Sequence, residues 1–306
     1  MKFFVASDLH GNLDFYESSL KHARDEKCQI AVFAGDLFPD GYSMSLSIDA
    51  QKDFIDEGLT YYLKEFSKAE IQVVLILGNQ DWAYCEKQIK ELEEKELCIY
   101  ANKKLIDVVG TEFQILGYNC VPQSDFYRKD WERLENRSTR VVPSEDFFTK
   151  PGIYKIYTID SSTWFTSKST IEDDLMTLPR PNNWRKTIVI THVPPKQTPL
   201  DRNYAGDSMG SASVRSFILS KQPLVTIHGH IHESPKVTGI YVCPMGSTWS
   251  INAGQQTGVP DFHACTFNIK DIPGTIKHTI FGGFKEVDDD ELYKTGAVPW
   301  NFPRLR

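Results

Sequence analysis

Hydrophobic positions in the first hundred residues alternate between short continuous runs and helical stripes. The runs at 2–6, 29–34 and 72–77 are almost entirely apolar, as expected of strands buried on both faces. Between them, apolar residues recur every three or four positions over 12–27 and 48–66, which predicts two amphipathic helices, the first capped by Asn12. A charged helix is expected at 86–97. This order predicts neighbouring parallel strands joined by right-handed crossovers.

The remaining chain is less regular. A hairpin is predicted around Gly110, and residues 120–186, which lack clear periodicity, are interpreted as an insertion or cap over the core. Strands are expected at 187–191 and 224–227, with a helix capped by Ser213 between them. Later runs, at 240–243, 264–269 and 275–281, predict a second, more antiparallel sheet. We therefore expect one α/β domain over residues 1–285 and a C-terminal tail, 286–306, that docks on the surface.

Composition narrows the function classes. The chain has 306 residues, of which 41% are hydrophobic and 25% charged, typical of a globular protein. Its net charge of −7 argues against nucleic-acid or anionic-membrane partners. The first apolar run is too short for an export signal, and no segment has the roughly 18 apolar residues of a membrane span. Six scattered cysteines without a CxxC pair favour reduced thiols and a cytoplasmic location. Nothing in the sequence indicates an oligomeric state.

Side chains that can bind metal follow each predicted strand of the parallel part. They are Asp8, His10, Asp36, Asn79, His192, His230 and His232. A single Asp or His at a strand end is more often a cap or a satisfied polar group, and Gly-Asp or Gly-Asn alone is an ordinary turn dipeptide. The joint pattern is more specific, because five of the eight histidines lie at predicted strand ends. Ligands in open α/β sheets bind at the carboxyl ends of the strands, so we expect these residues to converge.

This mixture of side chains has a definite chemistry. Carboxylate, amide and imidazole ligands without thiolates suit divalent Mn, Fe, Co, Ni or Zn, with Mn favoured here. Two such ions about 3.5–4 Å apart can activate a shared water and hold the attacking and leaving oxygens of an in-line displacement. The sequence therefore predicts a dinuclear hydrolytic site.

The motifs resemble those of the calcineurin-like metallophosphoesterase superfamily. They are D-x-H at 8–10, G-D at 35–36, G-N-x-D at 78–81, a lone His192 and G-H-x-H at 229–232. The stretches THVPP and HGHIHES look most like small prokaryotic phosphohydrolases. The resemblance implies two mixed β-sheets packed as a sandwich flanked by helices. It also implies one ion held by Asp8, His10, Asp36 and His232, and a second held by Asp36, Asn79, His192 and His230.

The same resemblance implies a reaction. A hydroxide that bridges the two ions would attack a phosphate mono- or diester of a small molecule, nucleotide or phosphoprotein. The catalytic residues would include Asn79, Gln80 and Asp81.

Gln80 departs from the family pattern, which has a histidine there that stabilises or protonates the leaving group. Glutamine cannot deliver a proton, and general acid catalysis is typically worth about 10²–10⁴-fold. We expect either a preference for activated esters or an acid from elsewhere, with Asp81 accepting a hydrogen bond from the Gln80 amide. A plain turn residue is the alternative reading of Gln80.

Other candidates each have a structural alternative. Asn12 can contact phosphate or only cap its helix, and Arg202, in the long loop 194–210, can bind substrate or be solvated. His228 is expected to be a buried, hydrogen-bonded histidine. Trp82 and Tyr84 can stack a base, although core packing is the commoner use of aromatic residues.

Two further functions remain open at the level of sequence. A nuclease of the same superfamily is disfavoured by the acidic charge. A binding scaffold without turnover is supported only by Gln80, since all seven expected ligands are present.

Overall fold

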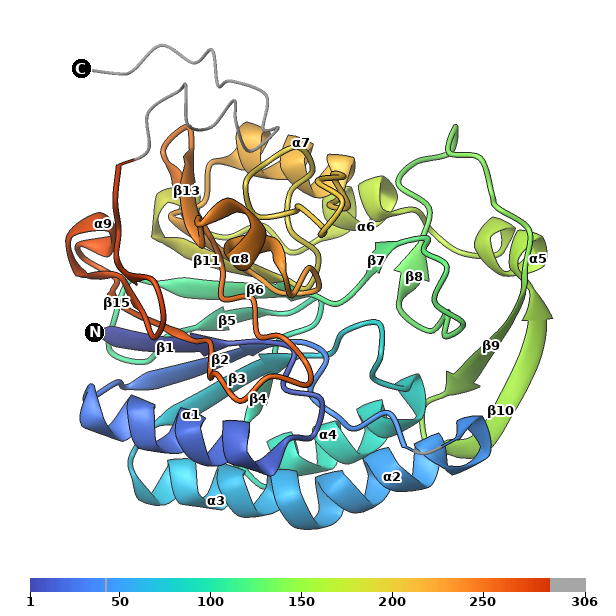
Figure 1. Cartoon of the computed structure of the whole chain (residues 1–306), viewed down its shortest axis with the longest axis horizontal. Coiled ribbons are helices and arrows are strands. Elements are labelled where there is room, and N and C mark those ends of the chain that lie inside the picture. The colour runs from blue at the N-terminus through green and yellow to red at the C-terminus, as the bar shows by residue number, and fades with distance from the viewer. Residues whose placement is uncertain (42, 287–306) are drawn as a thin grey trace.

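Two mixed β-sheets lie face to face, with helices over their outer faces (Figure 1). The structure is a computed structural model that describes residues 1–41 and 43–286. It confirms the predicted α/β sandwich. No helix in these two ranges is long and apolar enough to cross a membrane. The expected tail, 286–306, lies outside the described residues apart from its first residue.

The first sheet has the strand order β17-β16-β15-β1-β2-β3-β4. Its parallel part consists of β1 (Lys2–Ala6), β2 (Ile30–Ala34) and β3 (Gln72–Ile76), which follow the predicted runs, and of β4 (Ile99–Tyr100), which was not predicted. The antiparallel part consists of β15 (Cys265–Asn268), β16 (Lys277–His278) and β17 (Gly282–Gly283).

The second sheet has the order β13-β14-β12-β11-β6-β5. Its central parallel strands are β6 (Gln114–Tyr118), β11 (Thr187–Thr191), β12 (Val225–His228) and β14 (Thr248–Asn252). The edge strands β5 (Leu105–Asp107) and β13 (Val242–Met245) are antiparallel to their neighbours, and β5 with β6 forms the predicted hairpin. The expectation that the runs at 240–243, 264–269 and 275–281 lie together in a second, more antiparallel sheet is wrong. Those strands divide between both sheets, because β15 pairs with β1 whereas β13 pairs with β14.

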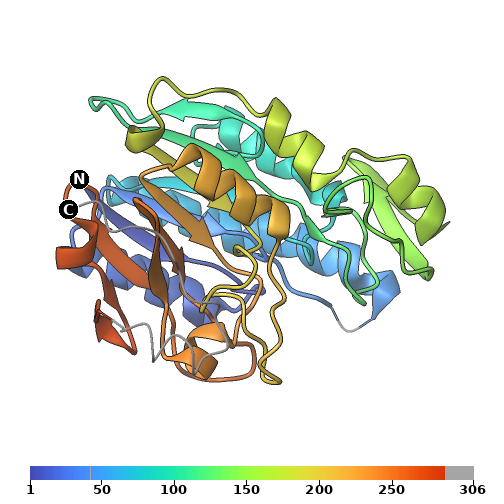
Figure 2. The ribbon, with the colours of Figure 1, turned by 90° about the horizontal axis from the view of Figure 1, so that it is seen from above.

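Helices cover the outer face of each sheet. The first sheet is covered by α1 (Leu13–Asp25), α2 (Ser47–Phe54), α3 (Thr60–Lys68) and α4 (Glu86–Glu94) (Figure 1). A π-helical turn, Ile55–Leu59, joins α2 to α3, so the predicted stripe of 48–66 is one continuous buried face. Over the second sheet lie α6 (Ile171–Thr177) and α7 (Ala212–Lys221), as Figure 2 shows from above. The cap of α7 is Ser211, which accepts from the N–H of Val214, and not the expected Ser213.

The central strands β1, β2 and β3 of the first sheet are buried on both faces, which explains their continuous apolar sequences. Phe3 and Val5 of β1 point between the two sheets, where they join a core cluster with Ile188 and Ile190 of β11. Phe4, the residue between them, packs on the opposite side under the helices. This alternation holds the carboxyl ends of the central strands rigidly in place.

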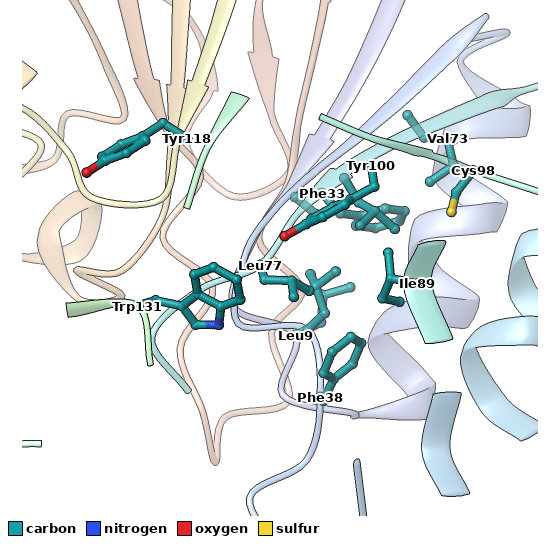
Figure 3. Packing of buried hydrophobic residues seen from close by; sticks show 14 of the residues in the cluster. Leu9, Phe33, Phe38, Val73, Leu77, Ile89, Cys98, Tyr100, Tyr118 and Trp131 are labelled. Carbon is teal, nitrogen blue, oxygen red and sulfur yellow. The ribbon is translucent and has the colours of Figure 1, made fainter. Parts of the chain in front are cut away.

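The insertion packs against the sandwich rather than lying apart from it. It contains β7 (Val121–Pro122), β8 (Glu132–Arg133), the hairpin of β9 (Glu145–Lys150) and β10 (Ile153–Asp160), and α5 (Ser161–Thr166). Trp131 belongs to the same core cluster as Leu9 and Leu77, and Figure 3 shows the three side chains side by side. Lys129 and Glu132 form a fully buried ion pair at 2.8 Å. The short helices α8 (Ser234–Thr238) and α9 (Ile272–Thr275) complete the described chain.

Candidate metal centre

The seven expected ligands converge at the carboxyl ends of five parallel strands. Asp8 and His10 follow β1, Asp36 follows β2 and Asn79 follows β3. From the second sheet, His192 follows β11, and His230 and His232 follow β12. Leu9, between the first two ligands, is buried in the core cluster and ties this turn to the sheet (Figure 3).

Four of these ligands have left-handed backbone conformations. The φ angles are 58° at Asp8, 46° at His10, 52° at Asp36 and 68° at His230. Such angles are uncommon outside glycine, and strain of this kind gathers at functional sites. Backbone hydrogen bonds hold the turns in register: Asp8 N–H donates to Gly35 O at 2.9 Å and His10 N–H to Asp36 O at 3.0 Å.

The motif glycines leave the space that the ligand side chains occupy. A Cβ at Gly78 would lie 2.3 Å from Oδ1 of Asp36, and one at Gly229 would lie 2.5 Å from Oδ2 of Asp8. A Cβ at Gly35 would lie 2.5 Å from Nδ1 of His192. These glycines are therefore more than turn residues, because any larger residue would displace a candidate ligand.

The first group of ligands is Asp8, His10, Asp36 and His232, whose donor atoms all lie within 4.8 Å of one another. Nε2 of His232 lies 3.1 Å from Oδ1 of Asp8 and 3.4 Å from Nε2 of His10. Two imidazoles and two carboxylates at such separations match the donor set of a divalent transition metal. Nδ1 of His10 is buried and has no hydrogen-bond partner among the described residues.

The second group shares Asp36 with the first and adds His192 and His230. Nε2 of His192 lies 3.2 Å from Oδ2 of Asp36. The amide oxygen of Asn79 lies 3.2 Å from the same His192 nitrogen and 2.8 Å from Nδ1 of His230. The two groups thus form adjacent metal-sized sites with one carboxylate between them.

Electrostatics at the centre favour ionised carboxylates. Burial raises the pKa of Asp8 and Asp36, but His232 beside Asp8 and His192 beside Asp36 outweigh burial, so both pKa values are lowered. Burial lowers the pKa of His192, yet Asp36 and Asp8 raise it to about 9. Burial lowers the pKa of His230 to about 3, with His192 acting in the same direction.

Backbone groups orient the ligands from outside. Nδ1 of His192 lies 2.7 Å from the carbonyl oxygen of Ala34, which fixes this nitrogen as the donor and leaves Nε2 toward the centre. The N–H of Gln80 donates to Oδ1 of Asp36 at 2.8 Å, and the N–H of His230 donates to Oδ1 of Asp8 at 3.0 Å. The same N–H of His230 lies 3.2 Å from Oδ2 of Asp8, so it holds both oxygens of that carboxylate, whereas Oδ2 of Asp36 remains directed at His192.

Asp81 does not accept from the Gln80 side chain, so that expectation is wrong. Asp81 is fully buried and accepts from the N–H groups of Leu37, Phe38 and Gly78 at 2.9–3.2 Å. It therefore joins the turn after β2 to the turn after β3. Burial and the neighbouring Asp36 raise its pKa to about 7.

The partner of the Gln80 side chain is Asp40. One arm of the Gln80 amide lies 3.1 and 3.0 Å from the two carboxylate oxygens, and hydrogen bonding assigns this arm as the nitrogen, because a carboxylate can only accept. Asp40 also acts on His10: burial lowers the pKa of His10, while Asp36, Asp8 and Asp40 oppose that shift. Sequence reasoning missed Asp40, because it follows Pro39 in an aperiodic stretch that gives no signal of its contacts.

The softer candidates have mixed outcomes. Asn12 caps α1 by accepting from the N–H of Asp14 at 3.0 Å, as predicted. Arg202 is buried and donates to the carbonyl of Gly206 at 3.1 Å within its own loop. His228 is buried and hydrogen-bonded to Thr191 and Thr226, as expected.

Trp82 is fully buried and donates to the hydroxyl of Ser47 at 2.9 Å. Its ring is therefore closed to a stacked base, and the alternative of core packing is correct.

Comparison with known proteins assigns the family. The profile of the Calcineurin-like phosphoesterase family matches residues 1–234, so the chain belongs to that family. Among curated proteins none matches significantly. A solved structure of TT1561 of Thermus thermophilus is 14% identical, with a TM-score of 0.51 and coverage of 90% of this chain and 97% of that one.

Two other solved structures are also 14% identical. One is an archaeal phosphodiesterase, with a TM-score of 0.41 and coverage of 91% of this chain and 98% of that one. The other is a dimetal phosphatase from Danio rerio, with a TM-score of 0.47 and coverage of 87% of this chain and 91% of that one. At this identity the likeness concerns the fold alone, and the Thermus thermophilus structure supports it.

Proposed function

We propose that the chain is a metal-dependent phosphoesterase that hydrolyses a phosphate mono- or diester at a dinuclear site. The observation that carries this proposal is the pair of ligand groups that share Asp36. Two divalent ions bound there, with Mn favoured, would supply Lewis-acid activation and an excess of about two positive charges over Asp8 and Asp36, which attracts phosphate even on an acidic protein.

The residues of the chain have separate proposed roles. Asp8, His10, Asp36 and His232 would hold one ion, and Asp36, Asn79, His192 and His230 the other. The N–H of Gln80 directs the second oxygen of Asp36 toward His192. Asp81 keeps two ligand turns together, so its contribution is positional. Asn12 and Arg202 are the proposed substrate contacts. The substrate is proposed to be a phosphorylated small molecule, nucleotide or phosphoprotein.

The insertion and the cysteines extend this proposal. Residues 1–285 would act as one unit, since Trp131 of the insertion packs in the main core. All six cysteines are free and buried, which supports the proposal of a reducing, cytoplasmic location.

The test combines metal analysis with a screen of mono- and diesters in the presence of Mn²⁺. We expect about two ions per chain and turnover of at least one ester class, both reduced strongly by Asp36→Asn. Asp25→Asn, at the exposed end of α1, is the matched control and should leave both unchanged. Full activity in Asp36→Asn would refute the mechanism, and fewer than one ion per chain in the wild type would favour a binding scaffold. Activity on DNA that falls steeply with salt would favour a nuclease.

A further inference from the structure

Arg128, a residue of the insertion, places a buried positive charge at the edge of the metal centre. The Arg128 side chain is fully buried, and its guanidinium stacks on Trp82, with 4.7 Å between the carbon Cζ and the ring centroid. Its Nη1 donates to the carbonyl oxygen of Gln80, which also accepts from Gln51 at 2.8 Å. Main-chain pairing with Phe147 of β9 holds this part of the insertion in place.

Asp40 lies between Arg128 and Gln80. Nη1 of Arg128 is 3.1 Å from Oδ1 of Asp40, and Nη2 donates to the carbonyl oxygen of Asp40 at 3.2 Å. The same carboxylate accepts from the Gln80 amide at 3.0 and 3.1 Å. Asp40 is half exposed, so it forms the outer edge of this group, while the N–H of Gln80 touches Asp36 on the inner side.

The direction of the Gln80 amide follows from these contacts. A carboxylate can only accept, so Asp40 requires the NH₂ arm of the amide. The carbonyl arm, about 120° away by the planar geometry of an amide, is then turned from Asp40.

We propose that Arg128 and Asp40 are positioning residues that make Gln80 a hydrogen-bond acceptor toward the substrate. A phosphoryl oxygen would not bind this acceptor, whereas a hydroxyl or amino group of the leaving group would. The site thus selects phosphoesters whose leaving group carries a hydrogen-bond donor. This inference rests on the proposed phosphoesterase function.

The experiment compares kcat/KM for 3-hydroxyphenyl phosphate and 3-methoxyphenyl phosphate, or for their methyl diesters, in the metal-loaded enzyme. The two leaving groups differ in one donor. One neutral hydrogen bond corresponds to a preference of about three- to tenfold for the hydroxy ester in the wild type. Gln80→Met should abolish that preference.

Asp40→Asn provides the sharper readout. The carbonyl oxygen of the introduced amide would stay with Arg128, so its NH₂ would face Gln80 and turn the Gln80 amide over. The preference should then disappear or reverse, while the metal content stays at the wild-type value. Asp125→Asn, an exposed carboxylate of the insertion, makes the same charge change and should keep the preference.

Arg128 is tested through non-additivity. Arg128→Met should lower the preference in the wild type but not change kcat/KM in the Gln80→Met background. An equal loss in both backgrounds would show a merely structural role and overturn the proposal. If Arg128→Met does not fold, Asp40→Asn alone decides, and a preference retained there overturns the proposal.

The outcomes separate this inference from the function. Hydrolysis of both esters at equal rates, unchanged in Gln80→Met, overturns the inference and leaves the phosphoesterase function intact. A metal-loaded wild type that hydrolyses neither these esters nor others overturns the proposed function.

Discussion

Gly78→Ala tests whether the motif glycines serve as space for the ligands. The added methyl carbon would lie 2.3 Å from Oδ1 of Asp36, 2.5 Å from its backbone nitrogen and 2.6 Å from Nε2 of His192. Since ordinary contacts are about 3.5 Å, both ligands must move by roughly 1 Å. Gly78 is outside the left-handed region, so the change adds volume without backbone strain. Overpacking of this kind costs about 1–3 kcal/mol.

The assay is the melting temperature with and without Mn²⁺. For the wild type, an ion present at 100 times its Kd adds about 2.7 kcal/mol, which corresponds to a rise in Tm of roughly 4 °C for a chain of 306 residues. Gly78→Ala should lower the metal-free Tm by roughly 2–5 °C and remove most of the Mn²⁺ shift, because the displaced side chains are the ligands. Gly283→Ala is the control, since its new Cβ would meet only the carbonyl oxygen of Ile276, at 3.9 Å. A Gly78→Ala protein that binds two ions and keeps the full shift would refute the steric argument.

Three further predictions concern the packing of the insertion and of the loop 194–210. Lys129→Met should lower the free energy of unfolding by about 3–5 kcal/mol at pH 8 in denaturant titrations, because it leaves Glu132 buried without its ion-pair partner. The double mutant that also carries Glu132→Gln should recover much of this loss. A Lys129→Met protein within about 1 kcal/mol of the wild type would contradict the prediction. Burial raises the pKa of Asp130 to about 7. The folded state therefore holds this proton more tightly than the unfolded state, and its contribution to stability is lost as pH rises from about 4 to 7. Asp130→Asn should flatten that dependence, and identical pH profiles would argue against the assignment. Asp201→Ala removes a buried acceptor of backbone N–H groups in the loop 194–210, so limited proteolysis should cut this loop faster than in the wild type, and unchanged cleavage would show that other contacts hold it.

The parallel strands and the convergence of the ligands could be predicted from local pattern, whereas the two-sheet sandwich was implied by the resemblance to the calcineurin-like metallophosphoesterase superfamily. Strands buried on two faces have continuous apolar sequences, and the carboxyl ends of parallel strands lie at the same edge of a sheet. The pairing of β15 with β1 could not be predicted, since neither strand has a sequence pattern that indicates pairing with a strand so distant along the chain.

The insertion escaped prediction for a different reason. Strand β10 is mostly exposed on both faces, so it has no alternation between apolar and polar residues. Arg128 acquires its role only through burial against Trp82 and pairing with Asp40, and neither contact has a sequence signal. The contact between the Gln80 amide and Asp40 therefore could not be predicted from the sequence.

The central position of β1 has a consequence for synthesis of the chain on the ribosome. Phe3 pairs with Ile30 on one side and with Phe267 on the other. One edge of β1 therefore stays unpaired until β15 has been translated, which takes roughly 13–50 s at about 5–20 residues per second. During that time the strand that leads to Asp8 and His10 presents an unpaired, apolar edge to other chains. Premature termination before β15 should leave a nascent chain that depends on chaperones.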